Sequence, residues 1–331
     1  MTHYGTGYAS TSTTTSTTTT SSTSRTPVVS FLDVSKTYGH LKAVDGLTLD
    51  LRPGETTALL GPNGAGKSTS LDMLLALRKP TSGKITMFGS DPYHAVKSGR
   101  VGAMLQSGGL MPEVTVRELV TLVTTLHPKP EPVDLTLKRA GIDKFADQRV
   151  DRLSGGQTQR VRFALAICGK SELIVLDEPT TAMDVETRRL FWDSMKAEVA
   201  EGRTLLFATH YLEEADQAAD RILVINRGRL LADGTPAEIK AKAGARRITF
   251  HLDQVDEQFL LGLPALVNLE VRHDFVQLQT SDSDATLYGV LDAGLRPRDI
   301  EVTGLGLEQA FIAITAEDDA TNGNAHAGET I

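Results

Sequence analysis

A glycine-rich stretch between an apolar segment and a helical pattern has the residue types that phosphate binding requires. It runs Gly61-Pro-Asn-Gly-Ala-Gly-Lys-Ser-Thr69, a glycine and four residues followed by Gly-Lys-Ser. Glycines let backbone N–H groups approach phosphate oxygens, and the helix that follows directs its positive end at the same anion. Lys67 supplies a point charge for the β- and γ-phosphates, and the Ser68 hydroxyl can bind Mg²⁺. The predicted nucleoside triphosphate site therefore comprises Gly61, Pro62, Asn63, Gly64, Ala65, Gly66, Lys67, Ser68 and Thr69.

A pair of carboxylates ends an apolar run further along the chain. Residues 173–176 lead into Asp177 and Glu178, and Pro179 stops the strand. Buried strands end abruptly in charge where a site lies at the carboxyl edge of a sheet. Asp177 is the candidate Mg²⁺ ligand, directly or through water, and Glu178 could polarise an attacking water. A solvated acidic turn is the simpler alternative, which the phosphate-binding stretch upstream disfavours.

A second helix start also has the features of an anion site. The octet Leu153-Ser-Gly-Gly-Gln-Thr-Gln-Arg160 precedes a long helical pattern. Ser154 is a good N-cap, and Gly155 and Gly156 leave the first N–H groups bare. Because one γ-phosphate already belongs to the first loop, a second such site makes sense if it closes on a nucleotide held by another copy or a homologous partner. An ordinary capped helix is the alternative, and Ser-Gly-Gly alone would favour it.

The elements that must position these residues alternate between short apolar runs and longer helical patterns. This alternation predicts an α/β domain with a largely parallel sheet over residues 28–243. The expected strands are 57–60, 101–105, 173–176, 204–208 and 221–225, and the expected helices are 67–77, 116–126, 155–167 and 185–199.

The pattern changes after a charged stretch at 240–247, where a small α+β domain is expected over residues 244–316. Its predicted strands are 248–252, 266–271, 276–280 and 299–303, with a helix at 285–293 and a short amphipathic helix near 307–314. Residues 1–27 are almost wholly Thr, Ser, Gly and Tyr and cannot bury enough apolar surface to offset their ordering entropy. We expect a disordered tail there, and a second flexible tail over 317–331.

Composition excludes several classes of protein. The net charge of −8 at pH 7 argues against a general nucleic-acid binder, so no nucleic-acid partner is expected. Cys168, the single cysteine, can form no internal disulfide and is expected to be a small apolar residue of a helix. The sequence has no apolar run of about 18 residues and therefore encodes no transmembrane helix. A protein with this sequence would be carried to a membrane by a partner.

The order of these motifs resembles the ATP-binding subunits of ABC transporters. Gly61–Thr69 is similar to the family's Walker A motif, Leu153–Arg160 to its signature and Leu173–Glu178 to its Walker B motif. The resemblance covers about residues 28–243. It implies a RecA-like core with an antiparallel β subdomain and a helical subdomain, to which this chain adds the small α+β domain.

The resemblance also assigns roles to single residues that would be weak evidence alone. Gln106, after an expected strand, resembles the glutamine that senses Mg²⁺ and links to the permease. His210 resembles the switch histidine that contacts the γ-phosphate, Tyr38 the ring that stacks on adenine, and Asp184 a member of the D-loop. With Glu178 orienting or deprotonating water, the implied catalytic set is Glu178, His210, Lys67 and Gln106, and the implied Mg²⁺ set is Ser68, Gln106 and Asp177.

In the family two cassettes sandwich two MgATP, and the intact motif set suits a homodimer as the second ATP-binding subunit. The loop of one chain would then face the other chain's Ser154, Gly155, Gly156, Gln157 and Asp184. Binding would close the pair and hydrolysis would open it.

A finer resemblance is to drug-resistance exporters of the daunorubicin type, whose multi-span permease is a separate chain. It rests on the residues from Gln106 to Glu118 and on the ending Leu307-Glu-Gln-Ala-Phe-Ile-Ala-Ile314. It implies export of drugs or hydrophobic metabolites at the cytoplasmic face of the cell membrane, with the permease docking near Met111. The D-loop departs slightly from the family, since Met183 replaces the more usual leucine.

Three other interpretations stay open. A soluble ABC ATPase acting on a non-transport complex would usually carry two cassettes or a long coiled coil, and this chain has one phosphate loop and no sustained heptads. A non-catalytic regulator would be expected to lose Glu178 or His210, and both are present. A generic P-loop kinase would lack the Leu153–Arg160 signature.

Overall fold

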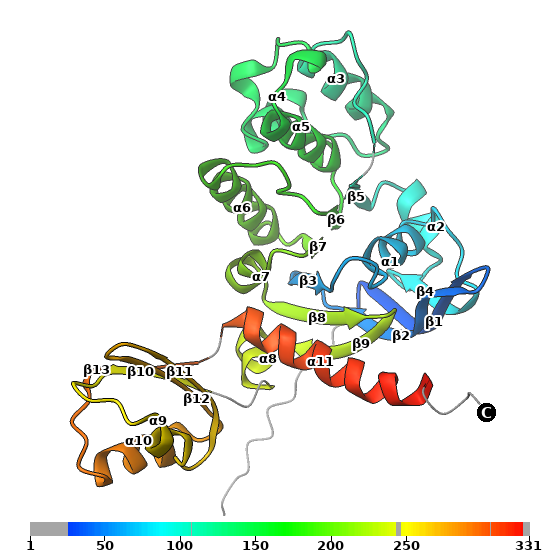
Figure 1. The fold of residues 1–331 in the computed structure, drawn as a ribbon. Coiled ribbons are helices and arrows are strands. Elements are labelled where there is room, and N and C mark those ends of the chain that lie inside the picture. The colour runs from blue at the N-terminus through cyan, green and yellow to red at the C-terminus, as the bar shows by residue number, and fades with distance from the viewer. Residues whose placement is uncertain (1–25, 107, 243–245, 305, 327–331) are drawn as a thin grey trace, which may run out of the picture.

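The computed structural model describes residues 26–106, 108–242, 246–304 and 306–326 (Figure 1). The predicted N-terminal tail therefore lies almost wholly outside the described residues, and so does the end of the predicted C-terminal tail.

The central sheet is mixed but mostly parallel, with the strand order β5-β6-β7-β3-β8-β9. All neighbouring strands run parallel except β8 and β9. Every residue of β3, β6, β7 and β8 is buried, which explains why the middle of each strand is a continuous apolar run without alternation. The strands are β3 (Thr56–Leu60), β5 (Val101–Met104), β6 (Leu173–Asp177), β7 (Thr204–Thr209), β8 (Arg221–Asn226) and β9 (Arg229–Gly234).

A smaller antiparallel sheet has the order β2-β1-β4 and shares an apolar cluster with one face of the central sheet. Its strands are β1 (Val29–Tyr38), β2 (Leu41–Leu51) and β4 (Ser82–Met87). The helices near it are α1 (Lys67–Leu74) and α2 (Pro92–Lys97). α1 is shorter than the predicted helix 67–77, because Ala76 has a φ of 57°, in the left-handed region that ends a helix.

A helical region projects from the far edge of the sheet (Figure 1). It contains α3 (Val116–Leu126), α4 (Val133–Arg139), the 3₁₀ turns η1 (Asp143–Phe145) and η2 (Val150–Arg152), and α5 (Gly155–Ile167). The predicted helices 116–126 and 155–167 agree with α3 and α5. These three parts confirm the predicted α/β class with a core, an antiparallel β region and a helical region.

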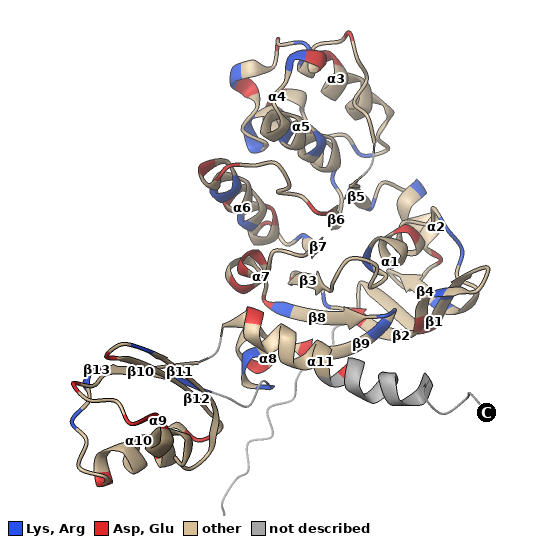
Figure 2. Cartoon of the chain, viewed as in Figure 1, with Lys and Arg blue, Asp and Glu red and all other residues tan. Residues whose placement is uncertain are grey.

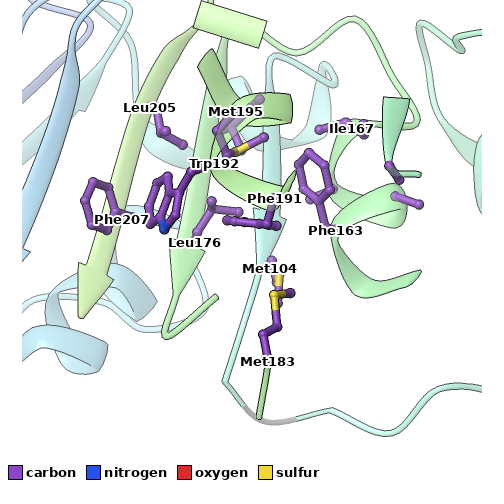
Figure 3. Packing of buried hydrophobic residues seen from close by; sticks show 14 of the residues in the cluster. Met104, Phe163, Ile167, Leu176, Met183, Phe191, Trp192, Met195, Leu205 and Phe207 are labelled. Carbon is purple, nitrogen blue, oxygen red and sulfur yellow. The ribbon is translucent and has the colours of Figure 1, made fainter. Parts of the chain in front are cut away.

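A row of aromatic rings packs between α5 and the core sheet and includes two rings of α6 (Val185–Ala200) (Figure 3). Phe163 of α5 meets Phe191 edge-to-face at 5.0 Å between ring centroids, and Phe191 meets Trp192 at 5.4 Å. Trp192 in turn lies 4.6 Å from Phe207 of β7. Edge-to-face pairs add to the area that large rings bury, so α5 is held at a set position relative to β6 and β7.

The C-terminal part forms a separate sheet with the order β11-β12-β10-β13. Its core includes Ile248, Phe250, Val276, Leu278 and Val290 and is distinct from the clusters of the larger region. Its elements are β10 (Arg246–His251), α9 (Glu257–Leu261), β11 (Leu266–Arg272), β12 (Phe275–Thr280), α10 (Ser283–Asp292) and β13 (Arg298–Gly304).

The last helix, α11 (Leu307–His326), continues well beyond the predicted end near residue 314. It returns from the C-terminal sheet to lie along α7 (Leu212–Ala218), α8 (Pro236–Lys242) and β9 (Figure 1). Residues 317–326, expected as part of a flexible tail, are helical, and Asp318 accepts a hydrogen bond from Asn226 at 2.9 Å. In the described part of the chain, no helix is long and apolar enough to cross a membrane.

Candidate functional site

The phosphate loop connects β3 to α1, as the sequence predicts. Gly66 caps α1 with a φ of 100°, a conformation that residues with a side chain rarely adopt. A Cβ on Gly66 would lie 2.5 Å from the carbonyl oxygen of Ala43, and one on Gly61 would lie 2.5 Å from that of Ile225. Both glycines are therefore required for the loop to pack against the strands behind it.

The Lys67 side chain is buried within the loop it follows. Its ammonium donates to the carbonyl oxygens of Gly61 at 2.6 Å and Pro62 at 3.2 Å. Burial lowers the pKa of Lys67, and the nearby carboxylates of Glu178 and Asp177 oppose that shift. A desolvated cation whose hydrogen bonds go to neutral carbonyls gains when a phosphate oxygen replaces them, so Lys67 suits an anionic ligand.

A pocket of about 450 Å³ opens in front of the loop. Tyr38 and Gln106 line it together with the loop and Glu178, although these residues come from four separate parts of the chain. The predicted adenine ring, the phosphate loop, the Mg²⁺-sensing glutamine and the candidate base are thus brought to one pocket. A larger groove of about 770 Å³, formed by the ends of α1, β4 and α2, contains none of the predicted site residues.

Asp177 ends β6 beside the loop. Its carboxyl group is buried, and its Oδ1 has no hydrogen-bond partner within the described part of the chain. Burial raises the pKa of Asp177, while a hydrogen bond with the Ser68 side chain opposes the shift. A buried carboxylate with a free oxygen beside a serine hydroxyl is a hard oxygen donor set, which fits Mg²⁺.

Glu178 and His210 meet at the end of the sheet. Glu178 follows β6 and is buried, with a φ of 51° in the left-handed region. His210 follows β7, and its Nδ1 lies 2.8 Å from Oε2 of Glu178. The His210 side chain is 46% exposed, so this pair joins a buried carboxylate to a ring that solvent and ligands can reach. The arrangement can orient a water and accept its proton.

Gln106 lies on the loop after β5, and its backbone is held from the helical region. Arg162 of α5 donates to the carbonyl oxygen of Gln106 at 3.4 Å and also to that of Gly108. Sequence reasoning did not single out Arg162, because one arginine in a helix has no signal that distinguishes it from a solvated residue. Met111, where the permease is predicted to dock, follows in the same segment and has an exposed side chain. The docking itself stays a prediction.

The signature residues and the D-loop do not reach this pocket within the chain. Ser154 and Gln157 form a capping box at the start of α5, with bonds of 3.2 and 2.9 Å. A Cβ on Gly155 would lie 3.3 Å from that of Ala182, so the start of α5 faces the D-loop. Asp184 caps α6 by accepting from the backbone N–H of Thr187 at 2.8 Å. Gly156 also lies beside Ala182.

Comparison with known protein sequences matches this chain to the family that its motifs resemble. The family model described as "ABC transporter" matches residues 44–181. The daunorubicin resistance ATP-binding protein of Streptomyces coeruleorubidus is 34% identical over 298 residues, which span 86% of this chain and 94% of that protein. The Nod factor export ATP-binding protein I of Burkholderia pseudomallei is 39% identical over 217 residues, 63% of this chain and 71% of that protein.

Solved structures with similar folds are ATP-binding cassettes. One is a dimeric cassette in a post-hydrolysis state with ADP and phosphate bound, with 27% sequence identity and a TM-score of 0.58. The similarity covers 62% of this chain and 98% of that cassette. The similarity extends over nearly the whole daunorubicin resistance relative. The loop and Glu178 line one pocket, and His210 contacts Glu178. This chain therefore belongs to the ABC transporter family, as an ATP-binding and ATP-hydrolysing subunit of the exporter type.

Proposed function

We propose that this chain uses MgATP hydrolysis to drive export of a drug or hydrophobic metabolite through a multi-span permease on a separate chain. The observation that carries the hydrolytic part is the contact between His210 and Glu178, which lines the phosphate-loop pocket. The export part is supported by the relatives whose names refer to daunorubicin resistance and Nod factor export.

In this proposal Tyr38 stacks on adenine and residues 61–69 hold the phosphates. Lys67 exchanges its two carbonyl partners for phosphate oxygens. Ser68, Asp177 and Gln106 would hold Mg²⁺, directly or through water, and a bound ion there would supply positive charge to the phosphates. The unpartnered Oδ1 of Asp177 and the place of Gln106 in the pocket lining support this assignment.

Glu178 acts on the attacking water. Its carboxylate accepts the proton as the water oxygen bonds to the γ-phosphorus and the bond to the bridging oxygen breaks, which leaves ADP and phosphate. His210 donates to the γ-phosphate and keeps the water in line. Because both residues follow strands of a buried sheet, positioning and electrostatics supply most of the rate enhancement.

A second copy of this chain completes each site. Ser154 and Gly155 are exposed at the start of α5 and remote from the pocket of their own chain, which suits a role on a partner's nucleotide. The backbone N–H groups of the α5 start would then contact the γ-phosphate. The assembly is proposed to lie at the cytoplasmic face of the cell membrane through the permease.

Replacement of Glu178 by Gln tests the hydrolytic proposal. We expect nucleotide binding to survive, because the loop and Lys67 are unchanged, while turnover falls by at least about a hundredfold. Binding is measured with a fluorescent ATP analogue and turnover by phosphate release. Turnover at the wild-type rate in Glu178→Gln would contradict the assignment of the base.

Purification of the tagged chain from gently solubilised membranes tests the transport proposal. We expect a multi-span membrane protein to copurify in a fixed ratio. Recovery only from the soluble fraction, with ribosomal or assembly proteins, would leave the ATPase activity intact but contradict the export role.

A further inference from the structure

Glu214 of α7 is a buried carboxylate that belongs to none of the groups described above. Figure 2 shows α7 as an acidic helix, and the neighbouring Glu213 is exposed, whereas the Glu214 side chain is only 3% exposed. Burial raises the pKa of Glu214, and its hydrogen bond with Thr180 and the charge of Arg188 oppose that shift. A carboxylate kept in such a place requires partners on more than one side.

The partners of Glu214 lie on the two segments that carry Glu178 and His210. Oε1 accepts a hydrogen bond from the Thr180 hydroxyl, and Thr180 is two residues after Glu178. Oε2 accepts from the Thr209 hydroxyl at 3.3 Å, and Thr209 directly precedes His210. One carboxylate therefore joins the end of β6 to the end of β7 at the point where the reacting pair emerges.

Arg188 of α6 forms a second connection to His210. Its Nε lies 3.1 Å from Oε1 of Glu214, and its guanidinium lies 5.3 Å from the centre of the Tyr211 ring. The Tyr211 ring packs on His210 with 4.1 Å between centroids. Thr209 also accepts a hydrogen bond from the backbone N–H of Tyr211 at 3.0 Å. The orientation of the His210 ring thus depends on groups that Glu214 holds.

Glu178 needs such support because its backbone is not in a preferred conformation. Its φ of 51° lies in the left-handed region, which surrounding structure must impose on a residue with a side chain. The backbone bond from Glu178 N–H to the Ala208 oxygen, at 2.9 Å, holds one side of the turn. Thr180 and Glu214 hold the other side.

We propose that Glu214 is a positioning residue that sets the geometry of Glu178 and His210 through Thr180, Thr209 and Arg188. The inference rests on the roles proposed above for Glu178 and His210. Glu214 contacts neither reacting group directly, and its effect on hydrolysis passes through the pair. A loss of alignment of about 1 Å is enough to slow a reaction by about a hundredfold.

The test is steady-state ATP hydrolysis by the full chain with Glu214→Ala, alone and combined with His210→Ala. We expect Glu214→Ala to lower kcat by about tenfold or more with KM for ATP within about twofold, since the loop is untouched. Glu214→Gln, which keeps the acceptor for Thr180, should recover part of kcat. The matched control is Glu213→Gln, an exposed neighbour on α7, which should behave as the wild type.

The double variant separates positioning from a general structural effect. Once His210 is removed, Glu214→Ala can still displace Glu178 but can no longer disturb its alignment with His210, so it should then lower kcat by a clearly smaller factor than in the wild-type background. An equal loss in both backgrounds, or a rise in KM at constant kcat, would overturn the inference. If Glu214→Ala fails to fold, Glu214→Gln and Thr209→Val replace it under the same criteria. Wild-type turnover in His210→Ala itself would overturn the proposed role of His210, and this inference with it.

Discussion

At the scale of one residue, the burial of Lys67 in the binding site lowers the stability of the nucleotide-free protein. Its ammonium is buried with two carbonyl oxygens as hydrogen-bond partners, and burial lowers its pKa. Removing a cation from water has a free-energy cost that neutral partners only partly offset. The residue is therefore suited to a charged phosphate, the ligand proposed for the loop.

Replacement of Lys67 by Met should therefore separate binding from stability. Met fills a similar volume without a charge, so we expect the nucleotide-free protein to melt at the wild-type temperature or above it. ATP at a hundred times its dissociation constant stabilises a wild-type protein by about 2.7 kcal/mol, and this gain should disappear in the variant. The measurement is a thermal melt with and without MgATP. Lys170→Met, at an exposed position, is the control and should keep the gain.

At the scale of elements, two helices of the helical region, α3 and α5, start with a capping box. Thr115 and Glu118 form a capping box at the start of α3, in which each side chain bonds the other residue's backbone N–H. These hydrogen bonds from the Thr115 backbone and hydroxyl lower the pKa of Glu118. The capping box therefore stabilises the protein most while the Glu118 carboxylate is ionised.

This cap predicts a pH dependence of stability. A carboxyl group with a lowered pKa in the folded state stabilises the protein above its ordinary pKa of about 4.3, and the contribution is lost as pH falls through the lowered value. Glu118→Ala should thus melt below the wild type near neutral pH, and the gap should close in acid. Melting curves between about pH 3 and about pH 7 measure the gap. Glu118→Gln keeps the capping box but has no titrating group at this position. The difference in melting temperature between Glu118→Gln and Glu118→Ala should therefore not change with pH.

At the scale of the whole molecule, α11 ties the end of the described chain to the ATP-binding region. Leu307 is buried in the main core cluster, Phe311 and Ile314 pack against that cluster, and Ala310 is fully buried on the same helix. Asn226, which ends β8 just before the turn to β9, donates to Asp318 of the same helix. The next glycine in that turn, Gly228, donates to the Ala65 oxygen of the phosphate loop at 2.9 Å. α11 therefore supports the strands behind the nucleotide pocket.

Substitutions on opposite faces of α11 test this support. Ala310→Asp places a charge in the core, and we expect it to lower the free energy of unfolding by about 3 kcal/mol or more. Ile312→Asp, at a position 57% exposed, should change it by less than about 0.5 kcal/mol. Chemical denaturation monitored through Trp192, which lies in the same core cluster, provides the readout. Equal effects of the two substitutions would show that α11 does not pack against the core in solution.

The sequence by itself determined the parts of this protein whose physics is local. The phosphate loop and the acidic strand end could be predicted because each functional group sits within a few residues of the strand or helix that positions it. The buried strands could be predicted because they are continuous apolar runs, and α3 and α5 because caps mark their starts. The end of α1 was missed, since the left-handed Ala76 has no signal in its residue type.

Only the tertiary structure decided which distant residues meet. The contact of Glu178 with His210 joins the ends of two neighbouring strands. The hydrogen bond from Arg162 to the carbonyl oxygen of Gln106 joins a helix to the loop after a strand. Glu214 and the return of α11 to the core are contacts of the same kind. Packing brings these groups together across long stretches of chain, so no periodicity or spacing records them. Local patterns in the sequence specify an element and its motif, whereas contacts between elements depend on how the whole chain packs.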